Sequence, residues 1–246
     1  MLSTLNAHPC ADPNIEVNTR GQSSNPQWYH ERKLRLTASR FYEILHTRDV
    51  EKFCMQMIAR NKHPIPSVRL SACQFGLDSE PVAMDLYVRR NAGRVGFYYQ
   101  PGVCVSLLYP PLAATPDFIV YADPLAKPIL PNNSDGAWLV EIKSFVTNPN
   151  ARDIMDLARI RTDFFFKPND DGHTITINKE HKFYYQIMGQ LNMVFGPDPN
   201  ARCDVVLFYS GDIFVLTLKN DIKFWSKRCD NLMKLGKYYI DLAETH

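Results

Sequence analysis

Apolar residues recur with two different spacings along the chain, and the spacing changes near residue 95. Before this point they recur every three or four positions, which is typical of amphipathic helices. After it, short β-branched or aromatic runs are separated by Pro and Gly, which favours strands. The pattern predicts helices that begin near residue 37 and cover 50–60 and 74–92, followed by strands at 95–100, 103–108, 118–122 and 137–142.

The second half of the chain combines both spacings. We expect a helical segment near 150–165, a short strand at 174–177, and an amphipathic helix at 179–194. Two strands at 204–209 and 213–218 are joined by Ser210-Gly211-Asp212, and a helix closes the chain at 221–242. This order predicts an α/β or α+β fold, with a sheet flanked by helices. Residues 1–25 are polar and contain two prolines, so we expect a flexible or extended segment before a single domain at 26–246.

Composition and charge exclude some classes of protein. Hydrophobic residues make up 45% and charged residues 22%, as in an ordinary globular protein. The net charge of +2 gives no overall signal for nucleic acid, and runs of basic residues are commonly solvated faces. The six cysteines lack the spacing of zinc ligands. No leader and no membrane-spanning run is present, so we expect a soluble intracellular protein, in either the nucleus or the cytoplasm of its host cell.

One predicted strand carries charge inside an apolar run. Residues 138–144 read W-L-V-E-I-K-S, and strand alternation places Glu141 and Lys143 on the same side. An ion pair on a solvated edge strand would explain this pattern. However, Asp117 follows a proline at the start of another apolar strand, and adjacent strands would bring it beside Glu141 and Lys143. Two carboxylates with an ammonium group suit Mg²⁺ or Mn²⁺, which can activate water for attack on phosphorus.

Several short motifs occur in a particular order. They are W-Y-H-E-R-K-L-R-L-T-A-S at 28–39, G-L-D-S-E-P-V-A at 76–83, P-D at 116–117, E-I-K at 141–143, and Y-Y-Q-I-M-G-Q-L at 184–191. Together they resemble the lambda exonuclease and YqaJ-type viral recombinase family of the PD-(D/E)XK nuclease superfamily. The resemblance spans about residues 28–195. It implies a restriction-endonuclease-like core with a central mixed β-sheet between helices.

The resemblance also implies roles for individual residues. Asp117, Glu141, Lys143, Glu80 and Gln186 would be catalytic, and Gln190 is a further candidate one helical turn beyond Gln186. The ligands of Mg²⁺, for which Mn²⁺ would substitute, would be the carboxylates of Asp117, Glu141 and Glu80 and the backbone carbonyl of Ile142. The 5′-phosphate of DNA would be bound by Arg32 and Ser39, with Arg35 as the rival to Arg32 because it is nearer to Ser39 in the sequence, and Thr37 would also bind DNA.

Other interpretations of these residues remain open. Ser39 would also serve as a helix cap, and Glu80 as a first-turn acidic residue favoured by the helix dipole. The sequence departs from the family pattern because the second glutamine is displaced and because Phe118 follows Pro-Asp. A long insert at 124–136 is predicted to form a loop between the two catalytic strands.

The resulting hypothesis is a metal-dependent DNA nuclease, acting as a 5′-to-3′ exonuclease on double-stranded DNA in recombination, replication or repair. The resemblance implies a ring-shaped homo-oligomer and a single-strand annealing protein as partner. Two alternatives are an endonuclease, on DNA or RNA, with the same core, and a non-catalytic nucleic-acid-binding protein that assists recombination.

Overall fold

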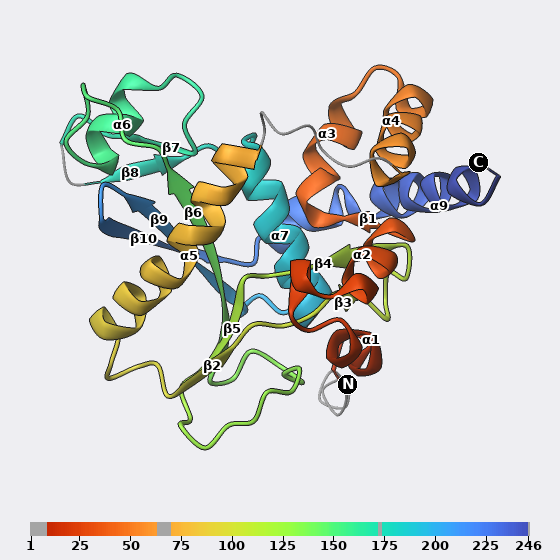
Figure 1. Cartoon of the computed structure of the whole chain (residues 1–246), viewed down its shortest axis with the longest axis horizontal. Coiled ribbons are helices and arrows are strands. Elements are labelled where there is room, and N and C mark those ends of the chain that lie inside the picture. The colour runs from red at the N-terminus through yellow and green to blue at the C-terminus, as the bar shows by residue number, and fades with distance from the viewer. Residues whose placement is uncertain (1–8, 63–69, 172–173, 246) are drawn as a thin grey trace.

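A five-stranded mixed sheet forms the centre of the protein (Figure 1). The structure is a computed structural model, and it describes residues 9–62, 70–171 and 174–245. The strand order is β10-β9-β6-β5-β2, and only β6 and β9 run parallel to each other. The strands are β2 (Phe97–Tyr99), β5 (Phe118–Tyr121), β6 (Ala137–Phe145), β9 (Arg202–Tyr209) and β10 (Asp212–Lys219). The predicted fold class is confirmed.

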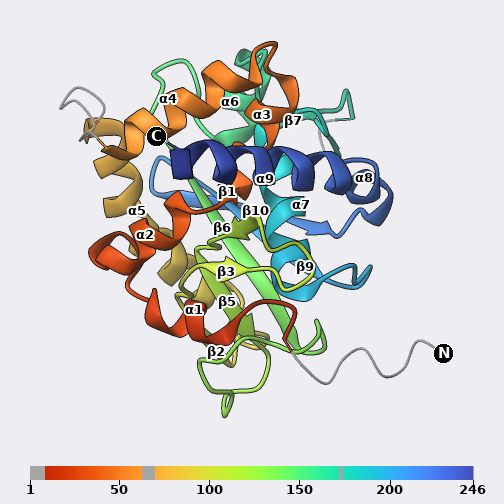
Figure 2. The same ribbon diagram turned by 90° about the vertical axis from the view of Figure 1, so that its right-hand side faces the viewer.

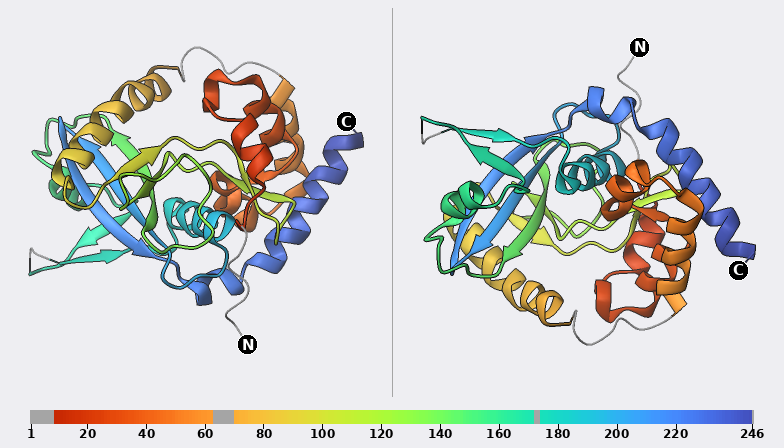
Figure 3. Two further views of the ribbon diagram at one scale, coloured as in Figure 1. Left: turned by 90° about the horizontal axis from the view of Figure 1, so that it is seen from below. Right: turned by 90° about the horizontal axis from the view of Figure 1, so that it is seen from above.

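Helices cover both faces of this sheet, which explains why β6 is buried on both sides from Ala137 to Ile142. On one face, α5 (Leu70–Arg90) packs Ala83 and Tyr87 against Trp138 and Val140. On the other face, α7 (Lys182–Phe195) contributes to the large core that contains Leu139. Figure 3 shows α5 and α7 on opposite sides of the strands. Because β6 lies in the middle of the sheet, the interpretation of Glu141 and Lys143 as an edge-strand ion pair is wrong.

A second, three-stranded sheet lies beside the central one. Its order is β1-β4-β3, formed by β1 (Leu36–Thr37), β4 (Leu112–Ala114) and β3 (Cys104–Val105). The predicted strand at 103–108 is cut short, because the Ser106 hydroxyl accepts hydrogen bonds from the backbone N–H groups of Leu108 and Tyr109 and turns the chain. The three-stranded sheet contacts η2 (Ala38–Arg40) and α9 (Cys229–Thr245). Helices α3 (Phe41–His46) and α4 (Val50–Lys62) pack against α9 (Figure 2).

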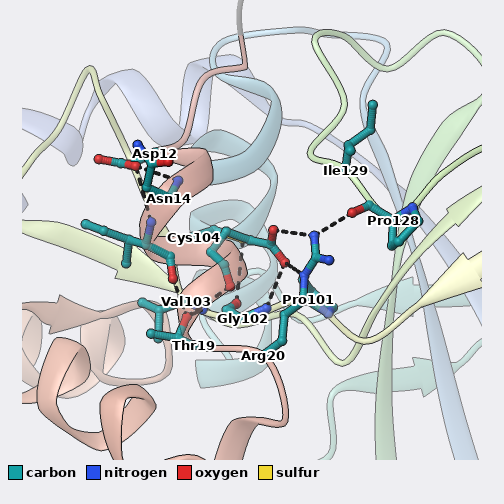
Figure 4. A network of polar contacts seen from close by, with 12 residues as sticks. Asp12, Asn14, Thr19, Arg20, Pro101, Gly102, Val103, Cys104, Pro128 and Ile129 are labelled. Atoms are coloured by element: carbon teal, nitrogen blue, oxygen red, sulfur yellow. Dashed lines mark hydrogen bonds and ion pairs between the residues drawn. The ribbon is translucent and has the colours of Figure 1, made fainter.

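The N-terminal segment differs from the extended chain that its composition suggested. Its elements are α1 (Pro13–Asn18), η1 (Gln22–Ser24) and α2 (Pro26–Lys33). Glu16 has 0% exposure, and both of its carboxylate oxygens accept from Arg20, at 2.8 and 2.7 Å. The Gly102 N–H also donates to Glu16, and the Val103 N–H donates to Thr19 (Figure 4). Residues 9–25 therefore pack on the domain, and residues 1–8 lie outside the described residues.

Other boundaries shift because of local hydrogen bonds. The predicted helix at 150–165 is only α6 (Ile154–Ile160), and a hairpin of β7 (Phe166–Pro168) and β8 (Ile175–Ile177) follows. His181 caps α7, so this helix begins at Lys182. The closing helix is divided into α8 (Ile222–Ser226) and α9. The insert at 124–136 forms turns and bends without a helix or strand, as expected. Within the described residues, no helix has the length and apolarity needed to cross a membrane.

Candidate active site

Asp117 and Glu141 meet at the point where β5 begins beside β6. Phe118 pairs with Val140, so Asp117 stands next to the part of β6 that carries Glu141. One oxygen of Asp117 accepts a hydrogen bond of 2.6 Å from the Ile142 N–H. Both carboxylates line the same pocket, of about 140 Å³. The structure thus brings together the two strand carboxylates that the motif singled out.

Glu141 is the most heavily bonded side chain of the site. It is 2% exposed, and Lys143 forms an ion pair with one of its oxygens. The same oxygen accepts from the Gln186 amide at 2.5 Å, and the other accepts from the Gln190 amide at 2.7 Å. Residues four apart share one face of a helix, so α7 presents both amides to one carboxylate. Gln190 therefore contacts Glu141 as directly as Gln186 does, although the motif is displaced.

Negative charges are concentrated at this point. Burial and the neighbouring Glu141 charge raise the pKa of Asp117 well above its usual value, and Lys143 only partly opposes this shift. Burial and Glu141 likewise raise the pKa of Glu80, which accepts a hydrogen bond of 3.1 Å from Gln100. For Lys143, burial lowers the pKa, but Glu141 and Asp117 outweigh it, so the pKa is raised overall and the ammonium stays charged.

This donor set fits a hard divalent cation in its chemistry. Ionised Asp117 and Glu80 are disfavoured here by burial and by the Glu141 charge, and a bound cation would relieve that repulsion. As the side chains lie, no group of three or more His, Cys, Asp or Glu residues in the described parts of the chain is arranged to hold a metal ion. The Ile142 carbonyl stays a prediction as the remaining ligand.

The same pocket is also lined by basic and neutral polar side chains. The Arg32 guanidinium donates to the Thr115 hydroxyl at 3.1 Å and lies 4.3 Å from the centre of the Trp28 ring. No carboxylate among the described residues forms an ion pair with Arg32. Burial and the charge of Arg40 lower its pKa to about 10, so it remains a cation at neutral pH. Ser39 lines the same pocket.

The alternative roles of Ser39 and Glu80 are not supported. Neither η2 nor α3 has a side-chain cap, so Ser39 does not cap a helix. Its hydroxyl lies 3.3 Å from that of Thr37. The first turn of α5 has no acidic residue, because the helix begins at Leu70 and Glu80 lies well inside it. The charges of Glu80, Asp117 and Glu141 act on one another instead.

Gln22 is a residue of the site that the sequence did not indicate. Its side-chain amide donates to the Pro101 carbonyl at 3.0 Å and to the Pro116 carbonyl at 3.2 Å, and it lines the pocket. Its φ of 45° lies in the left-handed region, which costs energy for a residue with a side chain. Gln22 thereby ties the N-terminal segment to the residue before Asp117. Only its tertiary position reveals this.

The expected phosphate-binding residues are divided between two pockets. Arg32 and Ser39 face the carboxylates, whereas Arg35 and Thr37 line an adjoining pocket of about 110 Å³. Arg32 lines both. Arg32, and not its rival Arg35, therefore shares the pocket of Ser39 and the two carboxylates.

Comparisons with known proteins agree with the motifs. Residues 12–96 match the sequence model of the family described as viral alkaline exonuclease. A search of curated proteins gave no match. The fold is similar to that of an alkaline exonuclease, LHK-Exo, from Laribacter hongkongensis, with a TM-score of 0.55 and 17% identity over 89% of this chain and 92% of that chain.

Two further solved structures are similar to this chain. LHK-Exo in complex with dAMP has a TM-score of 0.60 and 17% identity, over 89% of this chain and 94% of that chain. The protein of a SOX–DNA complex has a TM-score of 0.48 and 12% identity, over 94% of this chain and 72% of that chain. The ordered motifs, the match over residues 12–96 and the shared exonuclease fold confirm the resemblance seen in the sequence. This chain is therefore similar to the viral alkaline exonuclease family over residues 12–96 and shares the fold of LHK-Exo over most of its length.

Proposed function

We propose that the protein is a metal-dependent DNA nuclease that removes nucleotides from the 5′ end of double-stranded DNA. The observation that carries this proposal is a single pocket that is lined by both acidic and basic groups. Asp117 and Glu141 supply its carboxylates, and Arg32 and Ser39, which would bind phosphate, line the same pocket. A mononucleotide bound to LHK-Exo, which has the same fold, supports a substrate of this class.

Each residue has a role that follows from its contacts. Asp117, Glu141, Glu80 and the Ile142 carbonyl would hold Mg²⁺, which would activate a water molecule and neutralise charge at phosphorus when bound. Gln186 and Gln190 fix the orientation of the Glu141 carboxylate. The Lys143 ammonium remains charged beside Glu141 and would stabilise negative charge that develops on the phosphate.

Arg32 and Ser39 would determine where along a DNA strand the enzyme cuts. A guanidinium binds phosphate through paired hydrogen bonds, and the Ser39 hydroxyl would add another. Because Arg32 has no acidic partner among the described residues, a phosphate would supply its missing counter-charge. A terminal 5′-phosphate held there would place the neighbouring phosphodiester bond near Asp117 and Glu141.

A nuclease assay on end-labelled duplex DNA tests the function directly. The substrates are 5′-phosphorylated linear duplex, 5′-hydroxyl duplex, closed circular DNA and RNA, each with and without Mg²⁺ or Mn²⁺. We expect metal-dependent release of mononucleotides from the 5′-phosphorylated linear duplex and none from the circle. Cleavage of the circle or of RNA would favour the endonuclease, and no cleavage with either metal would favour the non-catalytic binding protein.

A ring-shaped homo-oligomer and an annealing partner are further proposals that follow from the family. Light scattering coupled to size-exclusion chromatography would measure the mass of the protein in solution. A monomer at all concentrations would contradict the ring.

A further inference from the structure

A second pocket, which we call the arginine pocket, adjoins the candidate active site. It is formed where α2, β1, η2, α4 and α9 lie side by side (Figure 2). Its volume is about 110 Å³, and four of its seven lining residues are arginines. The lining residues are Arg32, Arg35, Thr37, Arg40, Met57, Arg60 and Tyr239. None of them is acidic.

The positive charge of this pocket is only partly compensated. Arg35 forms an ion pair with Glu31 at 2.5 Å, and Arg40 has Glu43 at 3.8 Å, which is a long contact. No acidic partner within the described residues forms an ion pair with Arg32 or Arg60. Four guanidinium groups and two carboxylates leave a local excess of positive charge in a confined space.

The arginines repel one another, as the properties of Arg32 show. The charge of Arg40 contributes to lowering the pKa of Arg32, second only to burial. Placing like charges around one cavity is unfavourable unless an anion is bound between them. A fold that nevertheless places four arginines there is suited to an anionic ligand.

The chemistry of the pocket favours phosphate over other anions. Guanidinium groups bind phosphate oxygens through paired, charge-assisted hydrogen bonds. The Thr37 hydroxyl adds a neutral donor at the side nearest Ser39, 3.3 Å away. Arg32 forms the wall shared with the acidic pocket, so a ligand here would lie next to the DNA bound at Asp117 and Glu141.

We propose that the arginine pocket is a second phosphate-binding subsite, which holds a phosphate of the DNA strand engaged in the active site. This inference rests on the proposed function, because it takes the DNA as substrate. It adds Arg40 and Arg60 to the residues that bind the substrate. The phosphate is an internal phosphodiester, because the terminal 5′-phosphate is assigned to Arg32 and Ser39 in the adjoining pocket.

The test uses the substitutions Arg40→Gln and Arg60→Gln in the full chain. Arg89→Gln is the matched control, because Arg89 is an exposed arginine of α5 that pairs with Asp85 and lines neither pocket. Fluorescence anisotropy in EDTA measures the affinity for duplex DNA without cleavage. Both 5′-phosphorylated and 5′-hydroxyl duplexes are titrated at several salt concentrations, and thermal unfolding checks that each variant is folded.

We expect each pocket variant to bind duplex roughly five- to tenfold more weakly than the control. The slope of log affinity against log salt should fall by about one unit for each phosphate that the variant no longer neutralises. The loss of affinity should be equal for both duplexes, and a loss confined to the phosphorylated duplex would contradict an internal phosphodiester. Arg60→Lys keeps the charge without the paired geometry and should recover part of the affinity.

Affinities and salt slopes of both pocket variants equal to those of Arg89→Gln would overturn the proposal. This failure is distinguishable from failure of the proposed function. If the wild-type protein digests DNA while the pocket variants bind normally, only the subsite is wrong. If the wild-type protein binds DNA through these arginines but cleaves nothing, the subsite stands and the nuclease assignment fails.

Discussion

The Gln190 amide donates a hydrogen bond of 2.7 Å to the buried carboxylate of Glu141, from the helix that packs over the strand. Gln186 donates to the other oxygen of the same carboxylate. Both oxygens of the Glu141 carboxylate thus accept hydrogen bonds from one face of α7. Its orientation depends on tertiary packing of the helix as much as on its own strand.

Replacing Gln190 with Ala should reduce turnover roughly ten- to a hundredfold. The substitution leaves one oxygen of the buried Glu141 without a donor, and a hydrogen bond to a charged group contributes about 1.5–3 kcal/mol. Each 1.4 kcal/mol corresponds to roughly a tenfold change in rate. Steady-state kinetics on phosphorylated duplex would measure kcat and KM separately. Wild-type kcat in Gln190→Ala would show that Gln186 and Lys143 alone orient the carboxylate.

The substitutions Glu141→Gln and Lys143→Met should each abolish cleavage and leave DNA binding largely intact. Under the proposed function both side chains would act at the phosphorus, whereas Arg32 and Ser39 of the same pocket would bind the DNA. Activity is measured on end-labelled duplex, and binding by anisotropy in EDTA. Retained cleavage in either variant would remove the assignment of the active site. Arg89→Gln, far from the pocket, should cleave at the wild-type rate.

Metal binding and stability should depend on pH in opposite directions. The raised pKa values of Asp117 and Glu80 mean that the metal-free folded protein holds more protons than the unfolded chain. Stability therefore falls as pH rises through these raised pKa values. Mg²⁺ competes with the same protons, so its stabilising effect should increase with pH. Thermal unfolding with and without Mg²⁺, from about pH 4, near the ordinary pKa of a carboxyl group, up to about pH 9, would measure both. A Mg²⁺ effect that is constant or falls with pH would contradict the assigned ligands.

Replacing Arg20 with Met should destabilise the protein by about 3 kcal/mol, because the fully buried Glu16 would lose its charged partner. Urea unfolding would measure this loss. The double variant Glu16→Gln, Arg20→Met should recover part of it, since the remaining amide carries no buried charge. A single variant as stable as the wild type would show that the ion pair is dispensable.

Gln22→Gly should separate activity from stability. Glycine adopts the left-handed conformation of this position without strain, which offsets the loss of the side-chain hydrogen bonds. We therefore expect a melting temperature close to that of the wild type and a lower kcat, because the Pro116 carbonyl beside Asp117 loses its hydrogen-bond donor. Gln22→Ala keeps the strain and should lower both. Full activity in the glycine variant would indicate that Gln22 has no positioning role.

The sequence predicts well those parts of the site that depend on local pattern. The strands of Asp117 and Glu141 are apolar runs bounded by proline and glycine, and both begin at the predicted residue; β5 ends one residue early, and β6 extends three residues beyond its predicted end. Strand adjacency then follows from the motif. The four-residue spacing of Gln186 and Gln190 predicts a shared helix face, and both contact Glu141.

The short strands, the burial of Glu16 and the arginine pocket depend on tertiary contacts that no local sequence pattern predicts. Strands β1 and β4 have only two and three residues, too few to show a period. Glu16 is a charged residue in a polar segment, and nothing in its neighbourhood indicates that Arg20 and Gly102 allow it to be buried. Arg60 is distant in sequence from Arg32 and Arg40, so only the folded chain shows that they line the same pocket.

The hydrogen bond from Arg20 to the carbonyl of Pro128, at 2.5 Å, carries a practical warning for anyone who expresses this protein. Pro128 lies in the insert between β5 and β6, and Gln22, two positions beyond Arg20, lines the candidate active-site pocket. A recombinant protein shortened to begin after residue 25 would lose both this hydrogen bond and the Gln22 side chain. Absence of nuclease activity in that shortened protein would therefore not test the function proposed for the full chain.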